Sequence, residues 1–329
     1  MYKSVIEGKG GIVARIVADS VSENGKRITT FELEYPRFIH SEIMTHRLFS
    51  RNAMSSRAVP IKKMIEQVRN NPATPIHWGK NQPGMQAEDE IRGVIHAYLN
   101  GIYFDTTTED FWKESANGAA EYAEAMCETG LHKQIVNRLL EPFQMMKTVL
   151  TSTEIDNFFW LRCHKDAQPE IKELADCMYK AMQESVPVLL SVNDWHTPYY
   201  GSGYWTEKSD SMDDVGNTFE VALKVSASCC AQVSYRVLDD SLDKALDIYD
   251  KLVNSKPVHA SPFEHQAKPM IISNACESHH LWNYPADGMG EDGVTHMDRF
   301  HSYWSGNFKG WIQHRQLIED NVCNKYDPS

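Results

Sequence analysis

Near the N-terminus, two runs of alternating apolar and polar residues meet at Asn24-Gly25. The runs span residues 11–23 and 26–36, and a period of two is typical of half-buried strands. Asn-Gly favours the tight turn that joins two antiparallel strands. Pro36 can then open a helix over 36–47, because proline is accepted in the first helical turn. The pattern predicts a β-hairpin followed by a helix.

The later pattern is mainly helical. Apolar residues recur at helical spacing from Gln86 onward, which predicts a helix there; they are Ile91, Val94, Ile95, Tyr98 and Leu99. Further helices are predicted over 108–130, 131–143, from about 169, from about 218 and over 242–253. Gly130 and Pro142 mark two of their ends, and Asp240 or Ser241 can cap the last one. The expected fold class is α/β (α+β), rich in helix around a modest sheet.

Polar segments divide the chain into parts. The stretch 193–214 is polar, aromatic and contains glycine, which is typical of a long surface loop. We therefore expect a core over 1–190, a loop over 191–215 and a second part over 216–329. Within that second part, residues 283–293 predict another loop or insertion.

Composition narrows the possible classes of protein. The net charge of −12 argues against a protein that coats nucleic acid, because such binding depends on neutralising phosphates. No run of 18 apolar residues is present, so no membrane span is expected, and the first residues lack a secretion signal. The seven cysteines form no Cys-x-x-Cys pair. They predict reduced thiols and a cytoplasmic location.

The stretch 45–60, THRLFSRNAMSSRAVP, concentrates cations and hydroxyls in an acidic chain. Guanidinium groups bind phosphate in a bidentate manner, and hydroxyls can complete such a cradle. The alternative is a solvated loop with three surface arginines, Arg47, Arg51 and Arg57. The spacing alone does not decide between them, because it is not that of a known phosphate loop.

Two other stretches carry candidate chemistry. Arg162 follows the apolar run 157–160, so it should lie at a buried edge and need an anionic partner. That partner could be a ligand, or it could be Asp166 or Glu170 in a structural ion pair. The stretch 254–269 holds His259, Ser261, Glu264 and His265, and four more histidines follow at 279, 280, 296 and 301. A hydrogen-bonded turn is expected there, and no metal, because zinc-like ligand spacing is missing.

Four segments together resemble the flavin-dependent thymidylate synthases, the ThyX family. They are 31–57, 132–142, 157–171, and the pair 230–236 with 258–267. In the family the last region precedes the others, so the resemblance implies a circularly permuted or partly duplicated chain. The implied fold is a ThyX-like mixed sheet flanked by long helices.

The resemblance also implies an activity. Family members transfer a methylene carbon from methylenetetrahydrofolate to C5 of dUMP and reduce it with FADH2, and NADPH reloads the flavin. The chain would then be a methyltransferase of nucleotide biosynthesis that makes dTMP. Its cofactor would be FAD, its co-substrates NADPH and the folate, and it would form a homo-oligomer, a tetramer in the family.

The matching positions imply site residues. Arg162 would be catalytic and would contact the pyrimidine ring. The substrate would be bound by Glu42, Ser55, Ser56, Arg57, Arg138 and Arg162. The flavin would be bound by His46, Arg47, Ser50, Asn157, Ser234 and Ser261.

Four positions depart from the family pattern. Thr45 stands in place of an arginine, Glu42 in place of a glutamine, Ala53 in place of an acidic residue and Ser56 in place of a glycine. Polar mismatches at a base discriminate strongly. A methylase or hydroxymethylase acting on dCMP or dUMP therefore stays open, as does a non-catalytic flavin- or nucleotide-binding relative. The aromatic and basic stretch 300–315 leaves a single-strand nucleic-acid binder as a third hypothesis, disfavoured by the net charge.

Overall fold

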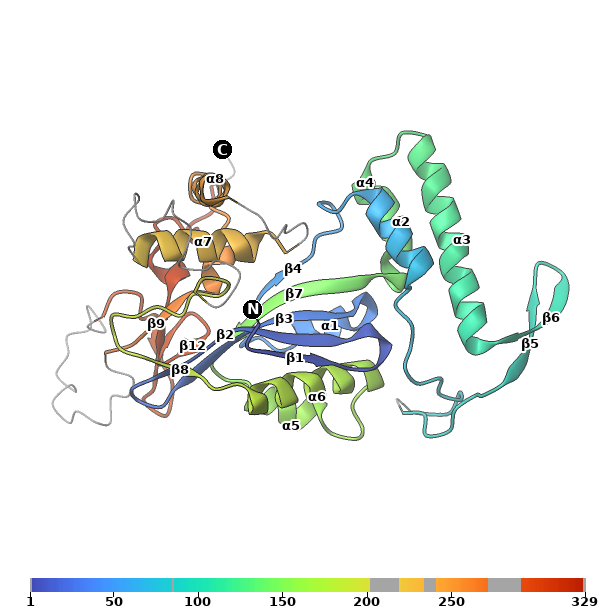
Figure 1. The fold of residues 1–329 in the computed structure, drawn as a ribbon, viewed down its shortest axis with the longest axis horizontal. Coiled ribbons are helices and arrows are strands. Elements are labelled where there is room, and N and C mark those ends of the chain that lie inside the picture. Colours follow the sequence, from blue (N-terminus) through green and yellow to red (C-terminus); the bar gives the residue numbers. More distant parts are fainter. Residues whose placement is uncertain (1, 85, 202–218, 234–240, 272–290, 328–329) are drawn as a thin grey trace.

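A six-stranded mixed sheet forms the centre of the fold (Figure 1). The computed structural model describes residues 2–84, 86–201, 219–233, 241–271 and 291–327. The strand order is β1-β2-β3-β7-β4, and β8 pairs in parallel with β2, whereas the other neighbours are antiparallel. The strands are β1 (Ser4–Glu7), β2 (Val13–Ser22), β3 (Arg27–Pro36), β4 (Ser50–Ala53), β7 (Met145–Ser152) and β8 (Val188–Leu190). This arrangement confirms the expected mixed sheet and α+β class.

The predicted hairpin is confirmed as β2 and β3. Their pairing runs from Val13 opposite Glu34 to Val21 opposite Arg27, with a register shift between Ile16 and Ala18. Gly25 has a φ of +74° in the turn, a conformation that favours glycine. After β3 the chain makes a short 3₁₀ turn and then α1 (His40–Met44), which confirms the helix predicted after Pro36.

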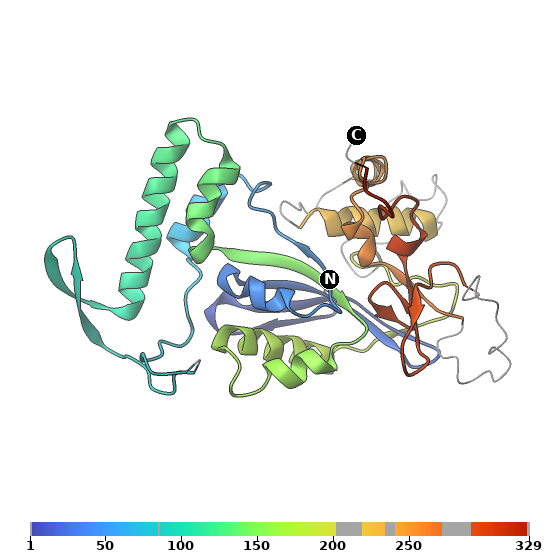
Figure 2. The ribbon, with the colours of Figure 1, turned by 180° about the vertical axis from the view of Figure 1, so that it is seen from behind.

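Helices cover both faces of the sheet. On one face, α5 (Asp156–Arg162) and α6 (Pro169–Glu184) pack Phe158 and Leu174 against Phe31 and Leu33 of β3. Burying each such side chain contributes about 1.5–3 kcal/mol. On the other face, α7 (Phe219–Ala231) and α8 (Leu242–Val253) share a core cluster with Val149 of β7. Figures 1 and 2 both show α5 and α6 along one side of the sheet.

A helical arm extends from the sheet at the end away from α7 and α8 (Figure 1). It contains α2 (Ile61–Asn70), α3 (Thr108–Glu128), α4 (Lys133–Val136) and the 3₁₀ helix η3 (Asn137–Phe143). The helices α2 and α3 meet through a core cluster that includes Val68, Ala116 and Leu140. The predicted helices at 108–130 and 131–143 are thus confirmed, although Pro142 lies inside η3 and not at its end.

The helix predicted from Gln86 is wrong. Residues Val94–Leu99 form strand β5, which pairs with β6 (Ile102–Thr107) in an isolated hairpin. The turn is Asn100-Gly101, and both residues have positive φ, 51° and 85°. The apolar spacing matched a helix by coincidence, and Asn-Gly was the stronger local signal.

The C-terminal part adds small sheets beside the main one. Strand β9 (Ala267–Pro269) pairs with β13 (Trp311–Gln313), and β10 (His296–Met297), β11 (Tyr303–Ser305) and β12 (Phe308–Lys309) form a second sheet. Ser241 caps α8 by accepting from the backbone N–H of Lys244. None of the helices in the described ranges is long and apolar enough to cross a membrane.

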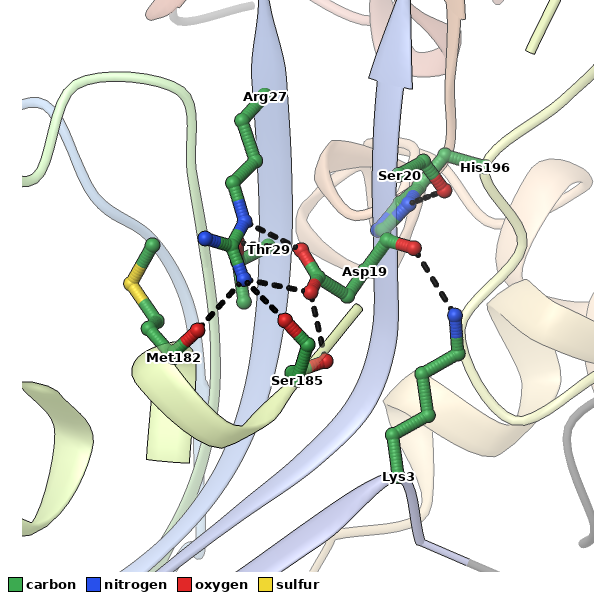
Figure 3. Close-up of polar contacts among 8 residues, drawn as sticks. All are labelled: Lys3, Asp19, Ser20, Arg27, Thr29, Met182, Ser185 and His196. Atoms are coloured by element: carbon green, nitrogen blue, oxygen red, sulfur yellow. Dashed lines mark hydrogen bonds and ion pairs between the residues drawn. The ribbon is translucent and has the colours of Figure 1, made fainter. Parts of the chain in front are cut away.

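An ion pair between the partly exposed Arg27 and the buried carboxylate of Asp19 fixes the hairpin to the end of α6 (Figure 3). Arg27 donates from Nε and Nη2 to the two carboxylate oxygens of Asp19, at 2.8 and 2.7 Å. Thr29 and Ser185 donate to the same carboxylate, and Arg27 also donates to the backbone of Met182. Burial alone would raise the pKa of Asp19, but the hydrogen bonds outweigh it and the pKa is lowered. This closed network is a structural clamp.

A buried chain of hydrogen bonds joins the sheet to the C-terminal part. Thr30 and Thr151 contact each other at 2.7 Å, and they bond to His196 Nε2 and His265 Nδ1 respectively, both at 2.8 Å. Burial lowers the pKa of both imidazoles to about 3. The two histidines are therefore neutral hydrogen-bonding groups of the core.

Candidate active site

The stretch 45–60 begins where α1 ends. Thr45 closes α1 by donating from its hydroxyl to the carbonyl of Glu42 at 2.6 Å. The chain then enters β4, which pairs with β7 from Ser50 opposite Thr151 to Ala53 opposite Thr148. A loop over the whole stretch is therefore the wrong interpretation, because residues 50–53 form part of the main sheet.

His46 and Arg162 form the centre of the candidate site. Arg162 Nε donates to His46 Nε2 at 3.1 Å. The imidazole stacks on Phe49 and meets the edge of Phe158, with ring centroids 5.7 and 4.9 Å apart. Burial, and then the charges of Arg162 and Arg51, lower the pKa of His46 to about 4. A neutral, fixed imidazole therefore orients the guanidinium at the end of α5.

Glu42 is the ion-pair partner of Arg162. The carboxylate Oε2 lies 3.6 Å from Arg162 Nη1, and both side chains are partly exposed, at 34% and 23%. Neither Asp166 nor Glu170 has this role. Glu170 is buried and accepts a hydrogen bond from the backbone of Ile76. The structural ion pair considered for Arg162 is thus replaced by a pair with Glu42.

Arg51 has a structural role in the stretch. Its Nη1 donates to the carbonyls of Ile43 and His46, at 3.0 and 3.1 Å, and so ties β4 to the end of α1. It is half-buried, and burial lowers its pKa while the charge of Glu264 opposes that shift. The expectation of three surface arginines is therefore wrong for Arg51, and sequence spacing gave no signal for this contact.

Ser50 is fully buried and already paired. Gln313 donates to its hydroxyl at 3.1 Å, and that hydroxyl donates to Asn307 at 3.1 Å. Asn307 also donates to the carbonyl of Leu48. This geometry does not support a direct contact between Ser50 and a flavin. Asn307 and Gln313 are supporting residues that the sequence interpretation missed.

Ser55, Ser56 and Arg57 form a turn next to the start of η3. The buried side chain of Asn137 donates to the carbonyls of Ser56 and Val59, at 2.6 and 3.2 Å. Ser55 Oγ accepts from the backbone N–H of Arg57. Because Asn137 precedes Arg138, the turn and Arg138 adjoin on this side of the arm. Sequence pattern did not identify Asn137, which fixes the arrangement.

The remaining candidates are exposed, and one cannot be placed. Arg47, Asn157 and Ser261 are exposed at the end of α1, on α5 and at the start of the 3₁₀ helix η4 (Ser261–Glu264). The helix η4 packs against β4. Within the part of the chain that the structure describes, the guanidinium groups of Arg47, Arg57 and Arg138 make no hydrogen bond or ion pair. Ser234 lies outside the described residues.

The predicted hydrogen-bonded turn over 254–269 is partly confirmed. His259 donates its backbone N–H to Ser255 Oγ, and Glu264 pairs with Arg315. His265 Nε2 is buried without a partner among the described residues. In those same residues no group of His, Cys, Asp and Glu is suited to a metal ion. His279 and His280 lie outside them.

A cavity opens beside Glu42 and Arg162. Its volume is about 1140 Å³, and it extends between residues 75–88 and the start of α6. Lys9, Lys165 and Lys172 line it together with several carboxylates. The Glu42–Arg162 pair therefore faces a space large enough for a small molecule.

The sequence model of one protein family matches residues 25–188, about half of the chain. It is described as thymidylate synthase complementing protein. The matched range contains the stretch 45–60, Arg138 and Arg162, and it excludes Ser234 and Ser261. None of the curated proteins compared with the chain matches it in sequence.

Two similar solved structures are from Helicobacter pylori. One is the flavin-dependent thymidylate synthase ThyX complexed with FAD and dUMP, with a TM-score of 0.33, 14% identity, and coverage of 47% of this chain and 67% of that one. The other is thymidylate synthase X with FAD and dUMP, with a TM-score of 0.33, 13% identity and the same coverages, 47% and 67%.

Proposed function

Because the match over residues 25–188 makes this chain a member of the family of thymidylate synthase complementing proteins, we propose that it is a flavin-dependent methyltransferase of nucleotide biosynthesis. It transfers a one-carbon unit from methylenetetrahydrofolate to C5 of a deoxypyrimidine monophosphate. The observation that carries this proposal is the Arg162 guanidinium, which a neutral His46 holds in the lining of a cavity of about 1140 Å³.

The exposed cations fit the anionic parts of a flavin and a nucleotide. The guanidinium groups of Arg57 and Arg138 have no partner in the ranges that the structure describes, and they lie on adjoining segments with the hydroxyl of Ser55 nearby. Arg47, next to His46 in the chain, is also exposed, and its guanidinium group has no partner among the described residues. Such groups bind phosphate strongly because charge and hydrogen bonds act together. In this proposal Arg57 and Arg138, with Ser55 and Ser56, hold the nucleotide phosphate, and Arg47 holds the FAD.

Arg162 acts on the pyrimidine ring. Its Nη hydrogens can donate to ring oxygen and nitrogen atoms, where negative charge develops as C5 becomes nucleophilic. His46 keeps the Nε–H occupied, and among the described residues no hydrogen bond uses the Nη groups, which therefore remain available to a ligand. Glu42 would contact the base beside Arg162. Asn157, on the exposed side of α5, and Ser261 would contact the flavin.

Bound FAD supplies the electrons that reduce the transferred carbon, and NADPH supplies them to the flavin. The chain contributes binding, orientation and electrostatics. For Ser50 and Ser234, a role in binding the flavin rests on the family resemblance alone. The hydrogen bonds of Ser50 argue against a direct contact with the flavin.

The assembly is proposed to be a homo-oligomer, with the tetramer as the family expectation. In the described residues no hydrogen bond or ion pair joins the turn 55–57 to the Glu42–Arg162 pair. A second copy could bring the two sets together.

We also propose that the chain divides into two parts at residues 191–215 and that the family's segments stand in permuted order along it. The packing of η4, from the second part, against β4, from the first part, supports this proposal. A cytoplasmic location, and the absence of a nucleic-acid partner, remain predictions.

Flavin binding tests this proposal first. The purified protein should be yellow, or become so with FAD, and a deoxypyrimidine monophosphate should perturb the flavin spectrum. Arg47→Ala should weaken FAD binding without changing the fold. A colourless protein that cannot be reconstituted with FAD would refute the proposal. A flavoprotein that binds nucleotide without forming product would instead be a non-catalytic relative.

A further inference from the structure

Glu42 and Arg162 keep hydrogen-bonding capacity that the described residues do not use. Arg162 Nε is occupied by His46, but no hydrogen bond involves Nη1 or Nη2 in the ranges that the structure covers. The Glu42 carboxylate has only the ion pair at 3.6 Å, which is longer than a hydrogen bond. Since both side chains line the cavity, a ligand there can meet all three groups.

These groups form an ordered edge. Nη2 and Nη1 of Arg162 are two adjacent donors, and the carboxylate beside Nη1 is an acceptor. Guanine presents the same order, two donors and one acceptor, when it pairs with cytosine. The order of side-chain groups therefore complements a base that has two adjacent acceptors followed by one donor.

We propose that the base bound at this edge is cytosine, so that the substrate is a deoxycytidine monophosphate. This inference rests on the proposed function, which supplies the class of nucleotide. Cytosine offers O2 and N3 as adjacent acceptors to Arg162 and its 4-amino group as a donor to Glu42. Carboxylates are the usual acceptors for that amino group in protein recognition of cytosine.

Uracil fits the same edge less well. Its order is acceptor, donor, acceptor, so N3–H would oppose a guanidinium N–H and O4 would oppose the carboxylate. If uracil moves along the edge by one group, its N3–H donates to Glu42 and its O2 accepts from Nη1. The other donor of Arg162, Nη2, is then left unmatched. A polar group left unmatched on binding is the kind of defect by which a site rejects an analogue.

Titrating dCMP and dUMP separately into the FAD-loaded protein tests this inference by calorimetry. The wild type should bind dCMP at least about tenfold more tightly than dUMP. In Glu42→Gln the ratio should fall close to one, because an amide can turn either its oxygen or its nitrogen toward the base. Asp156→Asn makes the same charge change on α5, away from the cavity lining, and should keep the wild-type ratio.

The outcomes separate the two proposals. If the wild type binds dUMP as tightly as dCMP or more tightly, or if Glu42→Gln leaves the ratio unchanged, the assignment of cytosine is wrong and the proposed function stands. If neither nucleotide binds to the flavin-loaded protein, the proposed function fails as well. Flavin content and the thermal unfolding midpoint of each variant exclude misfolding as the cause.

Discussion

Arg27 and Arg57 lie in two regions of the chain that differ in the partners they provide for a guanidinium group. Arg27 is held by Asp19 and by backbone carbonyls at the end of α6, in a network where each group has a partner (Figure 3). Arg57 is exposed, and its guanidinium group has no partner within the described residues. Both regions are rich in hydroxyls and cations. The difference is that folding provides Arg27 with partners, whereas the guanidinium group of Arg57 has none among the described residues.

The contrast predicts opposite effects of mutation. A buried, paired charge costs stability when one partner is removed, because the other charge remains buried and uncompensated. An exposed, unpaired cation contributes little to stability, so its removal should affect binding alone. Arg162 lies between these cases, because one side of its guanidinium is fixed by His46 and the other faces the cavity.

Asp19→Ala should have the largest effect on folding. It leaves Arg27 without its carboxylate and removes the acceptor of Thr29 and Ser185, so the free energy of unfolding should fall by about 3–5 kcal/mol. Chemical denaturation measures it. Glu34→Ala removes a carboxylate that forms a 3.5 Å ion pair with Arg15 and leaves Arg15 its second carboxylate, Glu32, so it should cost only about 0–1 kcal/mol. Equal losses for the two variants would contradict the structural contrast.

Arg162→Ala should have the largest effect on turnover. Removing a donor to developing charge costs about 10²–10³ in kcat. Arg162→Lys should lose nearly as much, because an ammonium lacks the planar fork. Steady-state rates with the FAD-loaded variants measure this, with circular dichroism as the control for the fold. Full activity in the alanine variant would refute the catalytic role.

The buried histidines should make stability depend on pH. Their pKa values are lowered to about 3 in the folded chain, against an ordinary value of 6.5. Below pH 6.5 the unfolded chain therefore binds protons that the folded chain does not, and the free energy of unfolding falls as pH falls toward 3. Each histidine contributes up to about 1.4 kcal/mol per pH unit in that window and nothing above it.

His196→Gln should reduce that slope. Denaturation at pH 7.5, 6.0 and 5.0 compares the variant with the wild type, and His77→Gln, at a partly exposed site, serves as the matched control. Between pH 6.0 and 5.0, the free energy of unfolding of His196→Gln should fall by about 1 kcal/mol less than that of the wild type. An unchanged slope would mean that His196 does not remain neutral in the folded state.

Arg138→Ala should have the smallest effect on stability. Because its guanidinium is exposed and has no partner within the described ranges, the free energy of unfolding should change by less than about 0.5 kcal/mol. Nucleotide affinity should fall by at least about tenfold, since a charge-assisted contact with phosphate is lost. Lys62→Ala, on the nearby α2, is a control for the loss of a positive charge. A large loss of stability would mean that Arg138 stabilises the fold, as Arg27 does, and would contradict its proposed role in binding.

Local signals explain how much of this fold could be predicted. The hairpin of β2 and β3 follows from alternation and Asn24-Gly25, and α3 and α6 follow from helical spacing. The hairpin of β5 and β6 was missed although Asn100-Gly101 carries the same turn signal. There the spacing of five apolar residues mimics a helix, and only the turn signal indicates the hairpin.

The candidate site depended on contacts that no local pattern encodes. Arg162 and His46 were predicted as site residues, but their hydrogen bond joins positions 116 residues apart. The pairing of Ser50 with Gln313 spans 263 residues, and the brace formed by Asn137 spans 81. Such contacts arise from packing of the sheet against distant segments, so the sequence indicated residue types and the fold determined which of them are free.

Product mass spectrometry tests the central claim most directly. The FAD-loaded protein is supplied with NADPH and methylenetetrahydrofolate, and with dCMP and dUMP in parallel. The expected product is one CH₂ heavier than the nucleotide, forms faster from dCMP and is lost in Arg162→Ala. The absence of any one-carbon product from either nucleotide, in a protein that binds FAD, would contradict it.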